Sequence, residues 1–253
     1  MLTAHGVSHP GRVRSKNEDV WLSALDLGLF IVADGMGGQN AGEIASSQAV
    51  DAIRSFVAST RQGDAVTWPF GEDPVLSHGA NRVLTALKLA NERVFQSGES
   101  EEQQNGMGTT AVVVLIEQSR MIYAGVGDSR IYSSIGGELR QLTRDDSWVS
   151  QILAHQPDVN QALLREHPMR NVLTKVIGPK ESIELTVQER LLDQGEVLLL
   201  CSDGLHGAVG DAAIGSILAS GAGVATMAER LVAAALEGPA SDNITALVVR
   251  HEA

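Results

Sequence analysis

Four aspartates stand at the ends of short apolar runs: Asp34, Asp128, Asp203 and Asp242. The runs before Asp34 and Asp203 have the length of a buried strand, so each carboxylate should emerge where a strand of a sheet stops. No thiolate or imidazole recurs at a fixed spacing beside these acids. Carboxylate oxygens alone favour hard divalent cations such as magnesium or manganese over zinc.

Two further acids, Glu18 and Asp19, stand near the N-terminus. Taken singly, each acid has a simpler interpretation, because Asp before Gly is a common turn dipeptide. The combination is more informative than any one of them. Like charges gathered at strand ends repel and raise one another's pKa, so clustering them makes sense chiefly when a cation neutralises them.

The composition indicates one large domain with an ample core, since 43% of the 253 residues are apolar. A single cysteine, Cys201, excludes an internal disulfide framework and a structural zinc cluster. The formal net charge of −12 argues against nucleic-acid binding, which needs a basic surface. With no leader-like start and no long apolar run, we expect a cytoplasmic chain without a membrane span.

Apolar patterning predicts an α+β fold, a sandwich of antiparallel sheets with helices on their outer faces. Gly136-Gly137, directly after one predicted strand, signals a hairpin turn. The predicted strands cover residues 29–33, 110–116, 121–126, 130–135, 196–201 and 244–249, and amphipathic helices cover 45–57, 83–94 and 228–236. We expect a surface loop over 63–79 and a mobile subdomain over 145–179, with short helical pieces at 148–153 and 160–165.

Arg14 stands a few residues before Glu18 and Asp19. A guanidinium beside a metal cluster can hold a phosphate by two hydrogen bonds while the cations polarise it, which points to phosphate hydrolysis. A cysteine-dependent mechanism is excluded because no arginine follows Cys201 in a phosphate loop. An Asp-x-Asp-x-Thr nucleophile loop is missing after the first predicted strand, and Asn40 replaces the third glycine of a dinucleotide-binding motif.

The chain resembles the metal-dependent serine/threonine protein phosphatases of type 2C (PPM), in their compact bacterial form. The matched blocks follow the family order from residue 6 to residue 249, and together they are highly specific. They are Arg14-x-x-Asn17-Glu18-Asp19, Asp34-Gly35-Met36-Gly37-Gly38, Met107-Gly108-Thr109-Thr110, Gly127-Asp128-Ser129-Arg130, Ser202-Asp203-Gly204 and Ser241-Asp242-Asn243-Ile244-Thr245.

The resemblance implies a role for each matched residue. Asp34 would bridge two cations, manganese or magnesium, with help from the carbonyl of Gly35. Asp203 and Asp242 would complete the first metal, and Asp19, with Glu18 through water, would complete the second. Asp128 would help to hold a third, weaker cation, Arg14 would bind the substrate phosphate, and residues 145–179 would form a flap beside the cleft.

By the same resemblance, the activity would be hydrolysis of phosphoserine and phosphothreonine on proteins. Two cations ~3.5–4 Å apart lower the pKa of a shared water, orient it for in-line attack and neutralise phosphoryl charge. The substrate would be a phosphoprotein, the product of a serine/threonine kinase, and we expect a monomer. The alternative is a catalytically weak or inactive fold of this type that serves as a regulatory phosphoprotein-binding module.

Two departures from the family pattern affect the expected chemistry. Met36 stands where several relatives have histidine, and a thioether cannot protonate a leaving group. Asp145-Asp146 replaces the Asp-His that bacterial members commonly have before Ser/Thr-Trp, here Ser147-Trp148, which concerns flap contacts. His206, three residues after Asp203, could lie near the cleft, and Trp148 is interpreted as a packing anchor of the flap.

Overall fold

The computed structural model describes residues 1–38, 41–61, 67–156, 158–160, 163–164, 167–238 and 240–252. The strands are β1 Leu2–His9, β2 Asp19–Ala24, β3 Leu29–Met36, β4 Gly108–Thr109, β5 Ala111–Glu117, β6 Arg120–Val126, β7 Arg130–Ile135, β8 Glu138–Gln141, β9 Gln188–Leu191, β10 Val197–Cys201 and β11 Ile244–His251. The helices are α1 Ala41–Ser59, α2 His78–Ser100, the 3₁₀ turn Glu102–Gln104, α3 Trp148–His155, α5 Asp203–His206, α6 Asp211–Leu218 and α7 Val224–Glu237.

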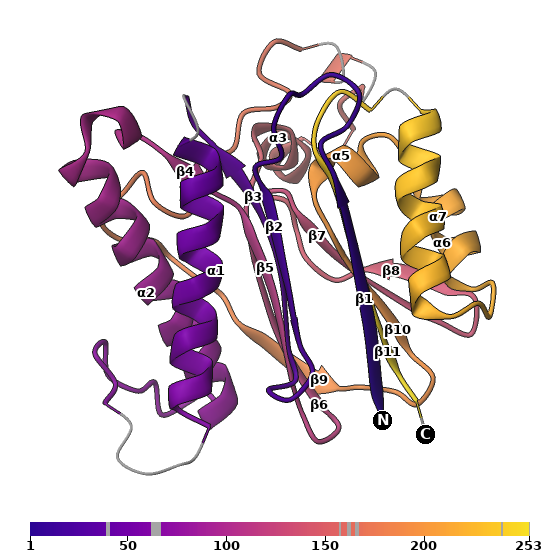
Figure 1. Ribbon diagram of the computed structural model, residues 1–253, viewed down its shortest axis with the longest axis horizontal. Helices are drawn as coiled ribbons and strands as arrows, with labels where there is room; N and C mark the ends of the chain where they lie inside the picture. The colour runs from indigo at the N-terminus through magenta and orange to yellow at the C-terminus, as the bar shows by residue number, and fades with distance from the viewer. Residues whose placement is uncertain are drawn as a thin grey trace.

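Two antiparallel sheets form the centre of the molecule. One has the strand order β1-β11-β10-β7-β8, and the other has the order β2-β3-β5-β6-β9 with β4 paired to β3. Helices α1 and α2 lie on one side of this pair of sheets, and α6 and α7 lie on the other (Figure 1). The fold is therefore the predicted α+β sandwich with helices on its outer faces.

Strand periodicity explains why three apolar layers form. In β3, Phe30 and Val32 face the opposite sheet, where they pack with Leu198 and Leu200 of β10. The alternate residues of β3, such as Ile31, face α1 and α2 instead. Because side chains alternate across a strand, a strand buried on both faces reads as one continuous apolar run. That is why β3 and β10 are visible in the sequence.

Most of the predicted elements are confirmed, with shifted ends. The three predicted helices lie within α1, α2 and α7, and Gly136-Gly137 joins β7 to β8 as a hairpin. Strands β1 and β2 are not apparent from the sequence. In the predicted loop, residues 67–77 have no helix or strand, residues 63–66 lie outside the described residues, and residues 78–79 begin α2.

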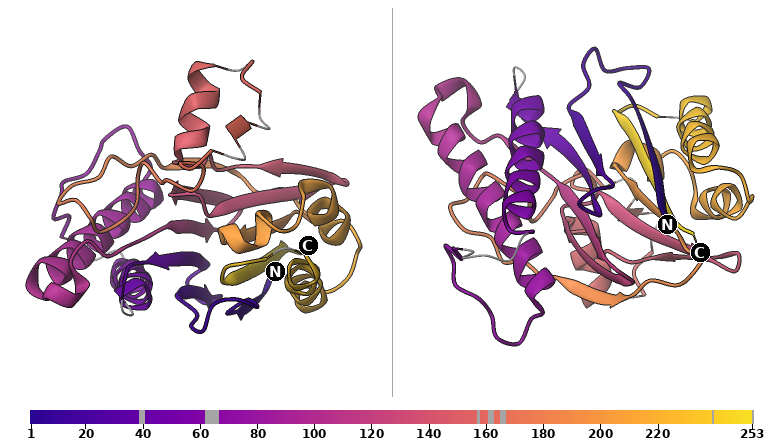
Figure 2. Two further views of the ribbon diagram at one scale, coloured as in Figure 1. Left: turned by 90° about the horizontal axis from the view of Figure 1, so that it is seen from above. Right: turned by 60° about the horizontal axis from the view of Figure 1, so that its bottom comes forward.

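The segment from 145 to 179 projects away from the sheets, and its helix α3 stands clear of them in the left view of Figure 2. Two isolated bridges fix its ends, Ser147 to Leu173 and Thr109 to Ile177. Helix α3 confirms the first predicted helical piece. Within the second, Leu163 and Leu164 are helical, and residues 161, 162 and 165 lie outside the described residues. None of the described helices has the length and apolar character needed to cross a membrane.

Candidate active site

Strand pairing places Asp19 directly opposite Asp34. Antiparallel β2 and β3 pair in a register in which these two residues are partners. We expected Asp34 to follow the end of its strand, but it lies inside β3. The strand continues past it because the short strand β4 pairs with Gly35 and Met36. The two carboxylates therefore belong to the sheet itself, which fixes their backbone positions.

Asp203 and Asp242 come from the other sheet. Asp203 is the first residue of α5 and is separated from the end of β10 only by Ser202, and Asp242 precedes β11, which pairs with β10. Asp19 connects the two sheets, because its Oδ2 accepts hydrogen bonds from Ser202 Oγ at 2.7 Å and Thr245 Oγ1 at 2.6 Å. The acids predicted at separate strand ends are thus brought together at one end of the sandwich.

Threonines from the block after α2 hold the backbone of Asp34. Thr110 Oγ1 accepts a hydrogen bond from Asp34 N at 3.0 Å, and Thr109 Oγ1 donates to Asp34 O at 2.9 Å. Thr110 Oγ1 also lies 2.7 Å from Ser129 Oγ, next to Asp128. Asp128 occupies the bend between β6 and β7. One buried threonine therefore joins Asp34 to the loop of Asp128.

Arg14 lies at the exposed rim of this cluster, where its Nη2 donates to Asp242 Oδ2 at 2.8 Å. The loop that carries Arg14 is held by Asn243. Its Nδ2 donates to the carbonyls of Pro10 and Lys16, and its Oδ1 accepts from Glu18 N at 2.8 Å. Glu18 is partly buried beside these groups. The chain around Asp242 therefore positions both Arg14 and Glu18.

The buried acids have raised pKa values. Burial raises the pKa of Asp34 well above its usual range, and the charges of Asp19, Asp203, Asp128 and Asp242 raise it further. Burial also raises the pKa of Asp19 to about 6, although hydrogen bonds from Thr245 and Ser202 oppose the change. For Asp128, burial and the charge of Asp203 raise the pKa to about 7. These acids therefore lack compensating positive charge.

This donor set fits a divalent cation. Asp19 Oδ1 and Asp203 Oδ1 are buried, and neither has a hydrogen-bond partner in the described structure. An unpaired buried carboxylate oxygen is costly unless a cation binds it. No three acidic, histidine or cysteine side chains of the described residues are placed to hold one ion together, and Asp242 is turned to Arg14. Backbone carbonyls and water would have to complete the coordination, as magnesium usually requires.

Close packing requires a glycine at position 35. A Cβ at this position would lie 2.0 Å from Gly42 O and 2.8 Å from Glu18 O. The first turn of α1 therefore approaches β3 so closely that no other residue fits. The family resemblance implied only that the Gly35 carbonyl would help to hold the cations. The structure adds that the glycine lets α1 pack beside Asp34.

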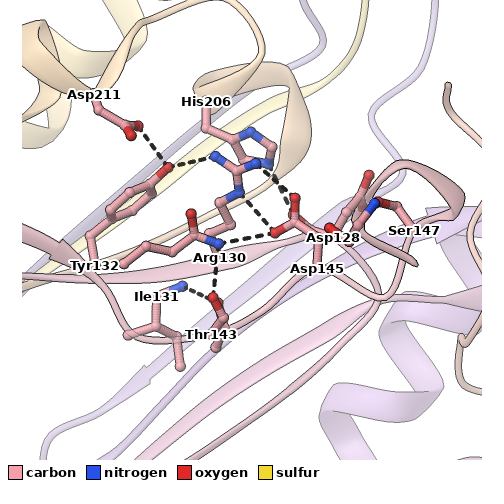
Figure 3. Close-up of polar contacts among 11 residues, drawn as sticks. Asp128, Arg130, Ile131, Tyr132, Thr143, Asp145, Ser147, His206 and Asp211 are labelled. Atoms are coloured by element: carbon pink, nitrogen blue, oxygen red, sulfur yellow. Dashed lines mark hydrogen bonds and ion pairs between the residues drawn. The ribbon is translucent and has the colours of Figure 1, made fainter. Parts of the chain in front are cut away.

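His206 makes a structural contact to the Asp128 loop. Its Nε2 lies 2.9 Å from the carbonyl oxygen of Asp128 and must donate, because that oxygen can only accept. Burial lowers the pKa of His206 to about 4, so the ring is neutral at pH 7. Because α5 begins at Asp203, His206 connects the helix of Asp203 to Asp128 (Figure 3).

Arg130 forms the centre of a second polar network, beside Asp128 (Figure 3). Its Nε and Nη2 donate to the two carboxylate oxygens of Asp145 at 2.9 and 2.7 Å, and its Nη1 donates to Tyr132 Oη at 2.8 Å. Tyr132 Oη in turn donates to Asp211 Oδ1 at 3.1 Å. Strand β7, α6 and the start of the flap are thereby joined.

Both carboxylates of the Asp145-Asp146 pair, which departs from the family pattern, have polar partners. Asp145 accepts from Arg130, and Asp146 Oδ2 accepts from Gly127 N at 3.3 Å while its Oδ1 lies 3.4 Å from Lys175 Nζ. Trp148 stacks on His167 with ring centroids 4.3 Å apart, which agrees with its interpretation as a packing anchor.

Several positioning residues were not singled out by the sequence analysis. Ser202, Thr245, Asn243 and Thr110 hold the acids or their loops, and all four lie inside the motif blocks that carry the acids. Their position next to the acids in the sequence could have identified them, because a small polar residue beside a buried acid is a candidate hydrogen-bond donor to it.

Comparison with known proteins gives one consistent result. The protein phosphatase 2C family model matches residues 6–244. The serine/threonine phosphatase stp of Listeria monocytogenes is 32% identical, over 96% of this chain and 93% of its own length. The solved structure of the Mycobacterium tuberculosis serine/threonine phosphatase PstP/Ppp has a TM-score of 0.85 and 32% identity, with 100% of this chain and 99% of that chain covered.

A second solved structure is the catalytic domain of the phosphatase PstP in complex with two manganese ions. It has a TM-score of 0.82 and 30% identity, and the match covers 98% of this chain and 97% of that chain. The matched family region includes all the acids described above, from Glu18 to Asp242. As the motif blocks predicted, this chain belongs to the protein phosphatase 2C family.

Proposed function

We propose that this protein is a metal-dependent phosphatase that removes phosphate from phosphoserine and phosphothreonine in proteins by direct attack of water. The observation that carries the proposal is the cluster of buried, uncompensated carboxylates around Asp34, with a guanidinium at its rim. Relatives named serine/threonine phosphatases, one of them solved with manganese, support the same activity.

Each residue has a proposed part in the reaction. Once Asp242 is released from Arg14, Asp34, Asp203 and Asp242 would hold one cation. Asp34 and Asp19 would hold a second, with Gly35 O and Glu18 as further ligands, and Asp128 would hold a weaker third. Manganese or magnesium, when bound, would activate the attacking water and neutralise phosphoryl charge. Arg14 would turn from Asp242 to the substrate phosphate and orient it, since its guanidinium is half exposed and its partner lies at the surface.

We further propose that the protein acts in the cytoplasm, as a monomer with one catalytic domain, on substrates of a serine/threonine kinase. The flap at 145–179 would border the substrate cleft. The net charge of −12 makes nucleic acid an unsuitable partner.

The proposal is tested by metal dependence. Hydrolysis of p-nitrophenyl phosphate and of phosphothreonine peptides should vanish in chelator and return with manganese. Asp203→Asn should lower kcat by at least ~10²-fold and also remove the rise in melting temperature that manganese gives the wild type. Asp26→Asn, a change in an exposed loop, is the control. Phosphopeptide binding without turnover in the manganese-loaded wild type would instead indicate a binding module.

A further inference from the structure

A groove next to the proposed active site is lined by Met36 of β3 and by residues of α2. Its volume is about 1310 Å³. Met36, two residues after Asp34 in β3, contributes to its lining and is 41% exposed. One wall is formed by residues of α2 between Lys88 and Gln96, and the other by residues between Leu173 and Glu184. The lining includes the apolar side chains of Met36, Phe70 and Phe95 and the amines of Lys88, Lys175 and Lys180.

Both walls are held in place by specific contacts. Asn91 Nδ2 donates to the carbonyls of Lys180 and Glu181 at 2.9 and 3.1 Å, and Asn91 Oδ1 accepts from Gly178 N at 2.9 Å. Thr109 and Ile177 exchange backbone hydrogen bonds in both directions. The returning chain is thereby fixed against α2 and β4, so the groove does not depend on the position of α3.

The dimensions suit an extended polypeptide. The wall residues on α2 run from Lys88 to Gln96, which is about 12 Å at ~1.5 Å per residue. An extended chain rises ~3.3 Å per residue, so this wall can accommodate about four residues. The groove is also larger than the ~300–1,000 Å³ typical of small-molecule sites.

The lining is apolar with balanced charge. Phe70 and Phe95 face the groove, and Lys88 Nζ lies 5.4 Å from the Phe70 ring centroid. Lys88, Lys175 and Lys180 balance three glutamates in the lining, although the whole chain carries a net charge of −12. The groove therefore repels a phosphorylated, anionic chain less than the average surface does.

We propose that this groove binds the substrate polypeptide beside the phosphorylated residue, with a bulky apolar side chain of the substrate seated against Phe70 or Phe95. The inference rests on the proposed function, because it uses the position of Met36 next to the acid cluster. A phosphorylated residue held at that cluster brings the adjoining chain to the part of the groove that Met36 lines. A free aryl phosphate would leave the groove empty.

The test compares two kinds of substrate. Phosphothreonine peptides with leucine at one position, up to four residues on either side of the phosphothreonine, are matched with peptides that have alanine there. We expect the wild type to prefer leucine at one or more positions by about tenfold in kcat/KM. Phe70→Ala combined with Phe95→Ala should reduce that preference to about twofold or less through KM, and should leave p-nitrophenyl phosphate turnover unchanged.

Leu191→Ala is the control, since Leu191 is an exposed apolar residue of β9 outside the groove. It should retain the leucine preference. The proposal is overturned if the wild type has no such preference, if the double variant keeps it, or if p-nitrophenyl phosphate turnover falls in proportion. Circular dichroism of the variants establishes that they fold.

Binding measured by fluorescence anisotropy separates the groove from the chemistry. A labelled leucine phosphopeptide should bind the slowly reacting Asp203→Asn protein more tightly than the same protein with the two phenylalanines replaced. Equal binding would contradict the groove assignment even if no turnover is measured. Failure of the wild type to hydrolyse p-nitrophenyl phosphate with manganese would contradict the proposed function alone.

Discussion

Asp19 shows how a single residue depends on distant parts of the chain. Its type and its place in a motif are visible in the sequence, but its orientation is set by Ser202 and Thr245, which are hydrogen-bonded to one of its oxygens. The other oxygen is left without a partner. Two hydroxyl donors on one oxygen thus leave the second oxygen free for another partner, which no reading of local sequence could have established.

Arg14 gives the first prediction at this scale. Arg14→Ala should raise KM for a phosphopeptide by about tenfold, with a smaller change in kcat, because it removes a charge-assisted hydrogen bond made to substrate and transition state alike. Steady-state kinetics with manganese measure it. Arg12→Ala removes an exposed arginine of the same loop and should change KM little. An unchanged KM in Arg14→Ala would show that the phosphate is held elsewhere.

Met36 gives the second prediction at the residue scale. It is exposed at the end of β3, where a side chain could reach a leaving group, yet its thioether carries no proton to donate. We expect kcat/KM across a series of aryl phosphates to fall as the leaving-group pKa rises. Met36→His should reduce that dependence and raise kcat for phosphothreonine peptides relative to p-nitrophenyl phosphate, by at most ~10²-fold.

Met36→Leu is the matched control, because it changes the side chain without adding a proton donor. Rates in the wild type that do not vary with leaving-group pKa would mean that protonation is already efficient or that chemistry is not rate-limiting. The idea that Met36 is a catalytic deficit would then be wrong.

At the scale of elements, the segment 145–179 is joined to the sandwich by a largely buried ion pair. Arg130 of β7 and Asp145 at the start of the flap segment are 21% and 13% exposed in their side chains, and the guanidinium binds both carboxylate oxygens. A bidentate pair of this kind fixes orientation as well as distance. The next residue, Asp146, contacts the bend that carries Asp128, because its Oδ2 accepts a hydrogen bond from Gly127 N and its backbone N donates to Gly127 O.

The third prediction concerns this clamp. Arg130→Ala should lower the free energy of unfolding by ~3 kcal/mol, because it leaves the Asp145 carboxylate buried without its partner. Arg140→Ala is the control. It breaks a pair with Glu138 on β8 whose two side chains are 71% and 72% exposed, so it should cost no more than ~0.5 kcal/mol. Urea unfolding of both variants measures the difference, and equal losses would contradict a structural role for the clamp.

The elements also show where sequence patterns fail. Strands β3 and β10 could be predicted because both their faces are buried, which makes them continuous apolar runs. Strand β1 could not, because its centre holds Gly6, whose Cβ would lie 2.5 Å from the Trp21 ring. Packing against Trp21 of β2 requires glycine there, a residue that is unfavourable in isolated strands. A tertiary contact thus overrides local propensity.

For the whole molecule, the motif blocks predicted the family and the acids, but not how the two sheets are joined. The chain ends lie side by side because β1 pairs with β11. Asn243 and Thr245 reach back to the N-terminal loop and to Asp19. Such contacts join residues more than 200 positions apart, and a pattern confined to neighbouring residues does not contain them.

Glu196 is a second connection between the sheets, at a distance from the acid cluster. Its carboxylate accepts hydrogen bonds from Arg190 of β9, from Ser133 of β7 and from Asp193 N, and it is 1% exposed. Burial alone would raise its pKa. The hydrogen bonds from Arg190, Ser133 and Asp193 outweigh burial, so the pKa of Glu196 lies below its ordinary value.

This lowered pKa predicts how stability changes with pH. Because the folded protein holds Glu196 ionised more readily than the unfolded chain, the stabilisation is complete above the unfolded pKa, about 4.5, and is lost as the pH falls through the lower folded value. Glu196→Gln should therefore lower the free energy of unfolding by ~1–2 kcal/mol at pH 7, and by progressively less as the pH falls below about 4.

Glu138→Gln, at an exposed pair, should show no such convergence with the wild type. Urea unfolding between pH 3.5 and 7 measures both differences. A Glu196→Gln deficit that is constant over this range would mean that the carboxylate stabilises the sandwich through shape and hydrogen bonding alone, independently of its charge.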